Sequence, residues 1–353
     1  MNMSRALFFL AMAAVMTALS NASCADGSRP LPARDLKNMP SLEGATGWIN
    51  SDPLDAKALR GRVVLVDFWT YTCINWRRTA PYLRLWARKY KDAGLVIVGV
   101  HSPEFGFERD PERVRKFTAA TNIEFPVAID SRHAVWRAFD NQYWPALYFV
   151  DAKGKIRQRL FGESDYDKAE TVLQGLLKEA GALGVDTTMA PVVGKGAEAA
   201  ADWANLKTPE TYTGFTRTER FASPGGVVPS RGHNYVAPPR LPDNQWALVG
   251  NWTITQESAR SNVADARVLY RFHARDLHLV MGAPAGSPVR IRLRIDGKAP
   301  GSAHGSDVDS NGAGTVSEYR MYQLIRQTAP IEYREAEILI LDPGIELFSF
   351  TFG

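Results

Sequence analysis

The chain has 353 residues, 45% of them hydrophobic, so it is long enough for two domains that each bury a core. Its 42 basic and 38 acidic residues give a formal net charge of +4, which is too small to indicate a nucleic-acid or anionic-membrane partner. We therefore expect no nucleic-acid partner.

The first 25 residues have the pattern of an export signal. The apolar run 6–19 has the length of a signal h-region and is short for a membrane span. Ser23-Cys24-Ala25 fits a small-x-small cleavage site, so we expect a mature chain from Asp26 and a periplasmic or secreted protein. A lipoprotein anchored at this cysteine is the alternative, disfavoured because a lipobox carries an aliphatic residue where Asn21 stands. An uncleaved anchor is a third reading.

The next part of the chain alternates between strand and helix patterns. Residues 26–44 are an extended lead-in, and residues 45–181 form the first predicted domain. Apolar runs predict strands at 63–69, 95–100, 125–129, 147–150 and 156–160, and helical spacing predicts helices from 73, from 110, at 131–139 and at 165–179. Such alternation with a terminal hairpin is typical of an α/β domain.

The second half of the chain has a different pattern. Residues 182–205 are rich in Ala and Gly and are predicted to be a linker, whereas residues 206–353 hold recurrent strand patterns separated by Gly, Pro, Asp and Asn. The clearest predicted strands are 268–272, 277–281, 289–295, 321–325, 338–341 and 347–352. This arrangement predicts an all-β sandwich or jelly roll.

Cys73 is the candidate nucleophile of the sequence. It stands between a buried strand and a helix, among backbone N–H groups at the positive end of the helix dipole, which favour thiolate. Arg77 and Arg78 add positive charge in the same turn. Cleavage before Asp26 would leave Cys73 as the one cysteine, and a single thiol in an oxidising compartment indicates reactivity or a lost partner. The alternative is a buried, inert cysteine.

The run Asp67-Phe-Trp-Thr-Tyr-Thr-Cys73-Ile-Asn resembles the thioredoxin superfamily, and more narrowly the exported TlpA-like domain of the DipZ family of thiol:disulfide interchange proteins. Pro81 matches the proline that kinks the active-site helix, and Trp144-Pro145 matches the cis-proline loop. The second half is similar to the carbohydrate-binding-module-like domain that ends DipZ proteins, through residues 211–214, 272–276 and 341–344. The resemblance covers almost the whole mature chain.

The resemblance implies roles for three further residues. Asp67 matches the buried acid of thioredoxins, where burial would raise its pKa and let it pass protons to and from sulfur. A strand-end acid bonded to backbone is the alternative. Trp144 and Pro145 are implied to bind substrate, because a cis peptide there would aim the Trp144 carbonyl at a substrate backbone. An ordinary trans proline is the alternative.

Trp76 is the main departure from the family pattern, Cys-x-x-Cys, because it replaces the second cysteine. That cysteine normally resolves the mixed disulfide of thiol–disulfide exchange, and an indole cannot. The resemblance then implies monothiol or isomerase-like chemistry without a cofactor, on exported proteins with thiols or disulfides, with a membrane electron donor as a further partner. Trp76 either stacks on a substrate or fills the space of the missing cysteine.

One loop of the β-region has the oxygen spacing of a calcium-binding loop, through Asp307, Asp309, Asn311 and Glu318. No helix pair flanks this loop, and loops of this composition are common between strands without metal. We assign no metal ligand, and the calcium loop remains the alternative.

Two further sets of residues in the β-region have two interpretations each. Trp246 and Trp252 are either core residues or a sugar-stacking platform. Arg290, Arg292 and Arg294 alternate along one strand and form either a solvated face or a site for an anionic ligand.

The sequence therefore predicts an exported thiol-disulfide oxidoreductase of monothiol or isomerase-like type. The alternative is a non-catalytic envelope binding protein that has lost dithiol turnover and recognises a glycan or protein through the β-domain. A peroxiredoxin-type peroxidase is disfavoured, because Thr70 alone matches the residues which that chemistry needs.

Overall fold

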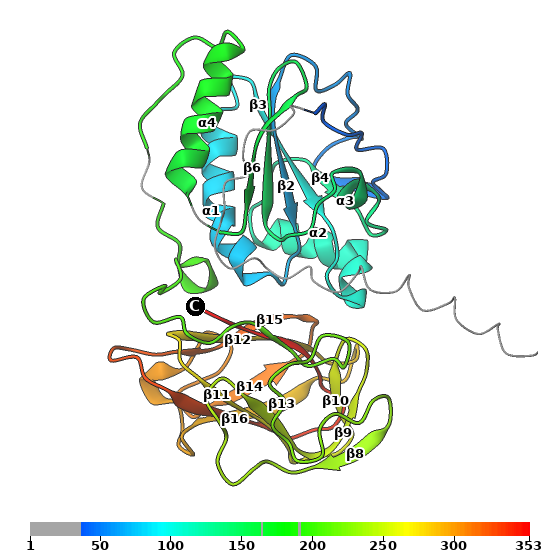
Figure 1. Ribbon diagram of the computed structural model, residues 1–353, viewed down its shortest axis with the longest axis vertical. Coiled ribbons are helices and arrows are strands. Elements are labelled where there is room, and N and C mark those ends of the chain that lie inside the picture. Colours follow the sequence, from blue (N-terminus) through cyan, green and yellow to red (C-terminus); the bar gives the residue numbers. More distant parts are fainter. Residues whose placement is uncertain (1–36, 164, 190–191) are drawn as a thin grey trace, which may run out of the picture.

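The structure is a computed structural model that describes residues 37–163, 165–189 and 192–353 (Figure 1). The predicted signal peptide, 1–25, and most of the predicted lead-in lie outside the described residues. Within the described ranges, no helix is both long enough and apolar enough to cross a membrane.

The first region is built on a mixed six-stranded sheet of order β1-β4-β3-β2-β5-β6. β2, β3 and β4 are parallel, while β1, β5 and β6 run antiparallel to their neighbours. The strands are β1 Gly47–Ile49, β2 Val63–Trp69, β3 Leu95–His101, β4 Val127–Ile129, β5 Ala146–Val150 and β6 Ile156–Phe161. Every residue of β2 is buried, which explains its unbroken apolar sequence.

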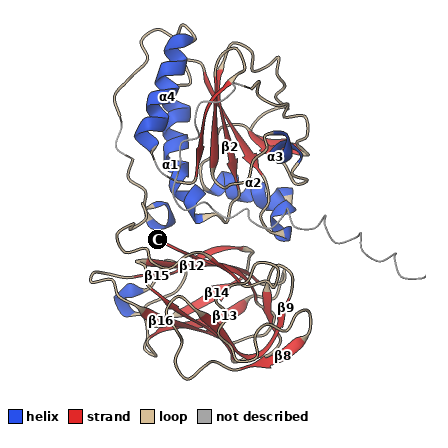
Figure 2. Ribbon diagram, in the orientation of Figure 1, coloured by secondary structure: helices blue, strands red, loops and turns tan. Residues whose placement is uncertain are grey.

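The helices of this region begin and end close to the predicted residues. They are α1 Ile74–Lys89, α2 Pro111–Ala120, α3 Ala134–Ala138 and α4 Tyr166–Glu179, with a short 3₁₀ helix, η1, at Gly106–Arg109. Asp110 is the N-cap of α2, and its carboxylate accepts the Glu112 N–H at 3.0 Å. The described helices gather around the first sheet, and strands dominate the second region (Figure 2).

The second region is all antiparallel and confirms the predicted β fold. Its main path is β14-β13-β16-β11-β9-β10-β17-β12-β15, with β7 beside β17 and β8 beside β9. The strands are β7 Thr211–Tyr212, β8 Gly232–Tyr235, β9 Trp246–Ile254, β10 Ala259–Ser261, β11 Ala266–Phe272, β12 Asp276–Gly282, β13 Val289–Ile295, β14 Ala313–Val316, β15 Arg320–Arg326, β16 Arg334–Ile340 and β17 Glu346–Phe352. The predicted strands all occur, but the sequence analysis missed β7, β8, β9, β10 and β14. In β9, the longest of these, Gly250 at φ +93° interrupts the pattern.

The two regions are packed against each other through β12, β15 and β17, which face the first region (Figure 1). Ile74 and Phe105 share one apolar cluster with Val280, Met321 and Phe348. Segment 182–205 also packs: its 3₁₀ helix η2, Gly196–Glu198, pairs with α1 through Glu198 and Arg84, whose closest atoms are 2.7 Å apart.

Candidate functional site

Cys73 lies at the junction between β2 and α1, as the sequence predicts. It is the N-cap residue of α1, and its own N–H donates to the Thr70 carbonyl at 3.2 Å. Its side chain is only 2% exposed. Cys73 is disulfide-bonded in this structure, and the other cysteine of the sequence, Cys24, lies outside the described residues.

The structure brings the Trp144-Pro145 loop to Cys73. The peptide bond is cis, as predicted, and the Trp144 carbonyl oxygen is 3.8 Å from the Cys73 Sγ. The indole of Trp144 donates to the Ser102 carbonyl at 3.0 Å and packs against Trp136, with 4.3 Å between ring centroids. The carbonyl is therefore held in place by the burial of its own side chain.

Asp67 and Trp76 form a buried pair behind the turn that carries Cys73. Both are fully buried, and the Trp76 indole N–H donates to Asp67 Oδ2 at 2.8 Å. Trp76 also stacks on Trp69, with ring centroids 4.1 Å apart. Of its two proposed roles, this geometry favours filling the space of the missing cysteine, because no face of the ring is open to a substrate.

The environment of Asp67 matches the expectation for a buried acid. Desolvation by burial raises its pKa to about 7, and the bond from Trp76 opposes that rise. Within the described part of the chain, its other oxygen, Oδ1, has no hydrogen-bond partner. Its carboxyl is therefore bonded to a side chain and not to the backbone, and one oxygen remains available to a proton.

Glu108 is a second buried acid, which the sequence analysis missed. It lies in η1, is fully buried, and accepts the Thr72 hydroxyl at 2.6 Å. Its other oxygen accepts the N–H groups of Glu104 and Phe105 at 2.6 and 3.0 Å. Burial raises the pKa of Glu108 to about 7. A glutamate three residues after Phe105 could have indicated a helix cap, but no local pattern points to Thr72.

Arg77 and Arg78 both make contacts within the protein. Arg78 is buried, forms an ion pair with Glu163 at 2.6 Å, and donates to the Phe352 carbonyl at 3.1 Å. Its charge is thus matched by the Glu163 carboxylate, so the expectation that Arg78 adds positive charge around Cys73 is corrected. The Arg77 guanidinium lies 4.9 Å from the centre of the Phe117 ring, and burial lowers its pKa to about 10.

The second region covers the turn that carries Cys73. Ile74 belongs to the apolar cluster shared with the β-domain, and the Tyr71 hydroxyl donates to the Tyr319 carbonyl at 3.4 Å. Elsewhere on this interface Glu104 accepts the Tyr212 hydroxyl at 2.7 Å and pairs with Arg217 at 2.9 Å. The β-domain therefore packs against Tyr71 and Ile74, which flank Thr72 and Cys73 in the chain.

The carboxylates of the loop that has the oxygen spacing of a calcium site point to separate partners. Asp307 pairs with Arg320 at 2.6 Å, and Asp309 accepts N–H groups of its own loop at 2.8 and 2.9 Å. Glu318 pairs with Lys116 at 2.5 Å. Among the described residues, no group of three or more His, Cys, Asp or Glu side chains could hold a metal ion.

The other candidate residues of the β-domain are structural. Trp246 and Trp252 are fully buried, so neither offers a platform to a sugar. The arginines of β13 alternate with buried residues and face outward, where Arg290 pairs with Asp342 at 2.8 Å and Arg294 with Glu337 at 3.3 Å. This arrangement is the solvated face.

Comparison with known proteins supports the same two-part reading. Residues 37–159 match the AhpC/TSA family, and residues 208–353 match the family described as thioredoxin like C-terminal domain. DipZ of Mycobacterium bovis and of Mycobacterium tuberculosis are each 35% identical over 346 residues, covering 95% of this chain and 45% of DipZ. The chain thus spans less than half the length of these relatives.

Two smaller proteins are similar to the first region alone. The thiol-disulfide oxidoreductase YkuV of Bacillus subtilis is 30% identical over 141 residues, covering 40% of this chain and 95% of YkuV. A solution structure of a thioredoxin-like protein in the oxidised form is 31% identical and covers 41% of this chain and 97% of its own, with a TM-score of 0.38. Because the match to YkuV spans nearly all of that protein, the chain belongs to the family of thioredoxin-like thiol-disulfide oxidoreductases, in a two-part arrangement that it shares with DipZ.

Proposed function

We propose that this protein catalyses thiol–disulfide exchange with Cys73 as its nucleophile and without a resolving cysteine at position 76. The position of Cys73 carries the proposal: the sulfur lies at the first turn of α1, 3.8 Å from the Trp144 carbonyl. The helix terminus favours thiolate. The carbonyl would accept an N–H of a bound substrate backbone.

The exchange proceeds in two balanced steps. The Cys73 thiolate attacks one sulfur of a substrate disulfide, which forms a mixed disulfide and releases the other sulfur as thiolate. A second thiolate, from the substrate or from a small thiol, then attacks the mixed disulfide and releases Cys73. When the second thiolate is a different cysteine of the same substrate, the substrate gains a new disulfide in place of the old one with no net oxidation, which is isomerisation.

Asp67 is the proposed proton carrier of this cycle. Its pKa of about 7 lets the carboxyl hold a proton or release it near neutral pH. It reaches the reactive turn through Trp76, whose indole occupies the place of the family's second cysteine. Asp67 is therefore a positioning and proton-holding residue in our proposal, and Cys73 is the catalytic one.

The proposed substrates are exported proteins, and the proposed location is the periplasm or the exterior. The apolar run 6–19 and the site Ser23–Ala25 support export. Cys73 is 2% exposed, and the β-domain packs against its neighbour Ile74. We propose that a protein disulfide reaches the sulfur through a movement of the β-domain away from the turn, coupled to substrate binding.

A non-catalytic binding role is the second candidate. The burial of Cys73, which is 2% exposed, favours it, because a sulfur that is never uncovered cannot exchange. In that case the β-domain would recognise an envelope glycan or protein, and the thioredoxin fold would be a scaffold.

The deciding experiment uses the reduced Cys24→Ser chain, in which Cys73 is the one cysteine. We expect it to reactivate a scrambled disulfide protein in a glutathione buffer, and expect Cys73 alkylation to show a midpoint well below the model thiol value of about 8.5. The matched control carries Cys73→Ser as well and should be inactive. An unshifted midpoint together with no reactivation would refute exchange and leave the binding role.

A further inference from the structure

Asp130 is a fully buried aspartate that directly follows β4. Its backbone N–H donates to the carbonyl of His101, the last residue of β3, at 2.9 Å. Because β2, β3 and β4 are parallel and His101 pairs with Trp69 in their register, the three strands end at one edge of the sheet. Asp130 therefore lies at the same edge as the turn that carries Cys73.

The carboxylate of Asp130 accepts three hydrogen bonds from two different elements. Oδ1 accepts the Val135 N–H at 3.1 Å, and Oδ2 accepts the Trp136 N–H at 2.8 Å. These bonds cap α3, whose N-cap residue, His133, makes no side-chain cap bond of its own. The third bond comes from the Ser102 hydroxyl, at 3.1 Å from Oδ2. Capping alone explains the first two bonds but not the third.

Ser102 and Trp136 are the same two residues that hold Trp144. The Trp144 indole N–H donates to the Ser102 carbonyl at 3.0 Å, and its ring packs against Trp136 with 4.3 Å between centroids. Both contacts lead back to Asp130, one through the Ser102 hydroxyl and the other through the Trp136 N–H. Asp130 thus fixes both supports of the residue whose carbonyl lies 3.8 Å from the Cys73 Sγ.

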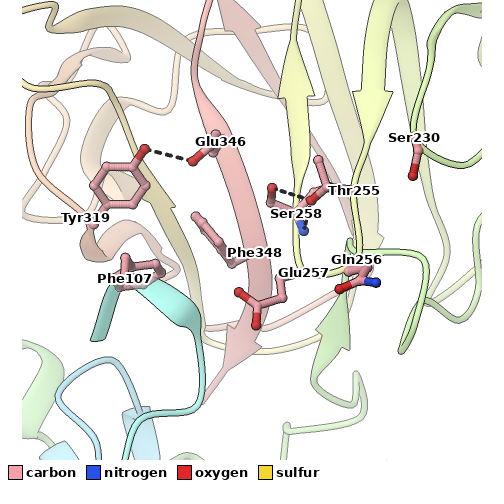
Figure 3. Close-up of a pocket in the computed structure, with 9 residues that line it drawn as sticks. All are labelled: Phe107, Ser230, Thr255, Gln256, Glu257, Ser258, Tyr319, Glu346 and Phe348. Atoms are coloured by element: carbon pink, nitrogen blue, oxygen red, sulfur yellow. Dashed lines mark hydrogen bonds between the residues drawn. The ribbon is translucent and has the colours of Figure 1, made fainter. Parts of the chain in front are cut away.

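This support of Trp144 is built within the first region. Trp136 and Trp144 belong to the apolar core of that region. The cleft at the interface with the β-domain, of about 520 Å³, is lined by other residues, among them Phe107, Tyr319 and Phe348 (Figure 3). The support therefore needs no residue of the β-domain and should persist when that domain moves.

We propose that Asp130 is a positioning residue for substrate binding, which holds the Trp144 carbonyl at Cys73 through Ser102 and Trp136. This proposal rests on the proposed function for the use of that carbonyl. The carbonyl would accept the same substrate N–H before and during the reaction, so its displacement weakens substrate binding more than it slows the chemical step.

The kinetic test compares two disulfides with the reduced Cys24→Ser chain. One is a peptide disulfide, and the other is hydroxyethyl disulfide, which has no N–H group to offer. Asp130→Asn leaves one acceptor oxygen where two are needed, and Ser102→Ala removes one bond only. Each should raise KM for the peptide, by about fivefold for Asp130→Asn, with little change in kcat. The reaction with hydroxyethyl disulfide should slow far less.

Asp151→Asn is the matched control. Asp151 is also a buried aspartate, and its Oδ1 accepts the N–H groups of Lys153 and Lys155 at 3.0 and 2.9 Å. It follows β5 at the far end of the sheet, where Val150 pairs with Val64 near the start of β2. Asp151→Asn should cost stability but leave KM unchanged. An equal rise of KM in Asp130→Asn and Asp151→Asn, or no rise in Asp130→Asn and Ser102→Ala, would overturn the positioning role.

A second measurement needs no thiol chemistry. Hydrogen exchange of the Trp144 indole N–H is followed by NMR in a chain labelled with ¹⁵N-tryptophan, with Trp144→Phe to assign the signal. Asp130→Asn should accelerate this exchange roughly tenfold, as for the loss of one buried hydrogen bond, and Asp151→Asn should not. Asp130-dependent protection in a chain without disulfide exchange would refute the proposed function alone. Disulfide exchange in which neither KM nor this protection depends on Asp130 would refute the positioning role alone.

Discussion

Asp67 and Glu108 are two buried carboxyl groups near the turn that carries Cys73, and they differ in the hydrogen bonds that they accept. Burial raises the pKa of both to about 7. Asp67 accepts one bond, from Trp76, whereas Glu108 accepts three, from the Thr72 hydroxyl and two backbone N–H groups. Equal burial therefore raises both pKa values to a similar level, although the two carboxyl groups differ in how many hydrogen bonds they accept.

The difference assigns the two groups different work. Both carboxylate oxygens of Glu108 accept hydrogen bonds, and one of these bonds joins η1 to Thr72, the residue before Cys73. Asp67 keeps one oxygen without a partner in the described part of the chain, so it can take up or release a proton without breaking a bond. Substitution of either carboxyl group, or of a hydrogen-bond donor to it, tests this distinction.

The largest effect is expected for Asp67→Asn. The native carboxyl holds its proton up to about pH 7 and the unfolded one only to about 3.8, so the native state binds more protons between these values. Stability must then fall as pH rises through that window, by about 4 kcal/mol for this residue. Asp67→Asn should remove this part of the decline.

Urea unfolding at several pH values between 3.5 and 8 measures the effect. The difference in unfolding free energy between Asp67→Asn and wild type should grow by about 4 kcal/mol across the series, whatever the offset at low pH. A difference that does not change with pH would show that Asp67 titrates normally and cannot serve as the proton carrier.

Glu108→Gln should produce the next largest effect, with the same sign. The pKa of Glu108 rises from 4.5 to about 7, so this carboxyl contributes a stability decline of about 3 kcal/mol between those pH values. Glutamine can still accept the two N–H groups and can donate to Thr72, so we expect the turn to survive. In the urea unfolding series, the decline in unfolding free energy that is due to Glu108 should disappear. The pH profile of the exchange rate should keep the change near pH 7 that is due to Asp67.

An exchange profile that loses its step near pH 7 in Glu108→Gln but keeps it in Asp67→Asn would reverse the roles assigned here. The two variants thus serve as controls for each other, because each removes one buried charge and leaves the other.

Much of this site could be predicted because its spacing along the chain is local. A buried strand followed by a helix places Asp67, Cys73 and Trp76 within ten residues, and their mutual positions follow from the geometry of that junction. The loop at Trp144-Pro145 was found from the family resemblance and not from spacing. The α/β and all-β halves followed from hydrophobic periodicity alone.

Glu108 and the domain interface could not be predicted in this way. Glu108 contacts Thr72 across 36 residues, and no periodic pattern records such a contact. The structure of β12 does reflect the interface. Every residue of this strand is buried, although buried and exposed residues should alternate in a strand of an isolated sandwich. Continuous burial indicates that a second surface covers the strand, but it does not name that surface.

Trp76→Phe tests the Asp67 side of the comparison. It removes the one hydrogen bond that Asp67 accepts and keeps an aromatic ring beside Trp69. We expect the loss of unfolding free energy to be about 2 kcal/mol greater at pH 8, where the carboxylate is charged, than at pH 5. An equal loss at both pH values would mean that only packing was lost, and that the indole N–H does not stabilise the charge.

Thr72→Val tests the Glu108 side and should have the smallest effect. It removes one of three bonds to that carboxyl, from a buried hydroxyl, and valine preserves the side-chain volume. We expect a loss of about 1 kcal/mol at pH 8, measured by urea unfolding, because the N–H groups of Glu104 and Phe105 still hold the other oxygen. A loss as large as that of Trp76→Phe would mean that the hydroxyl, and not the backbone, stabilises the charge, and the two carboxyls would then be held in the same way.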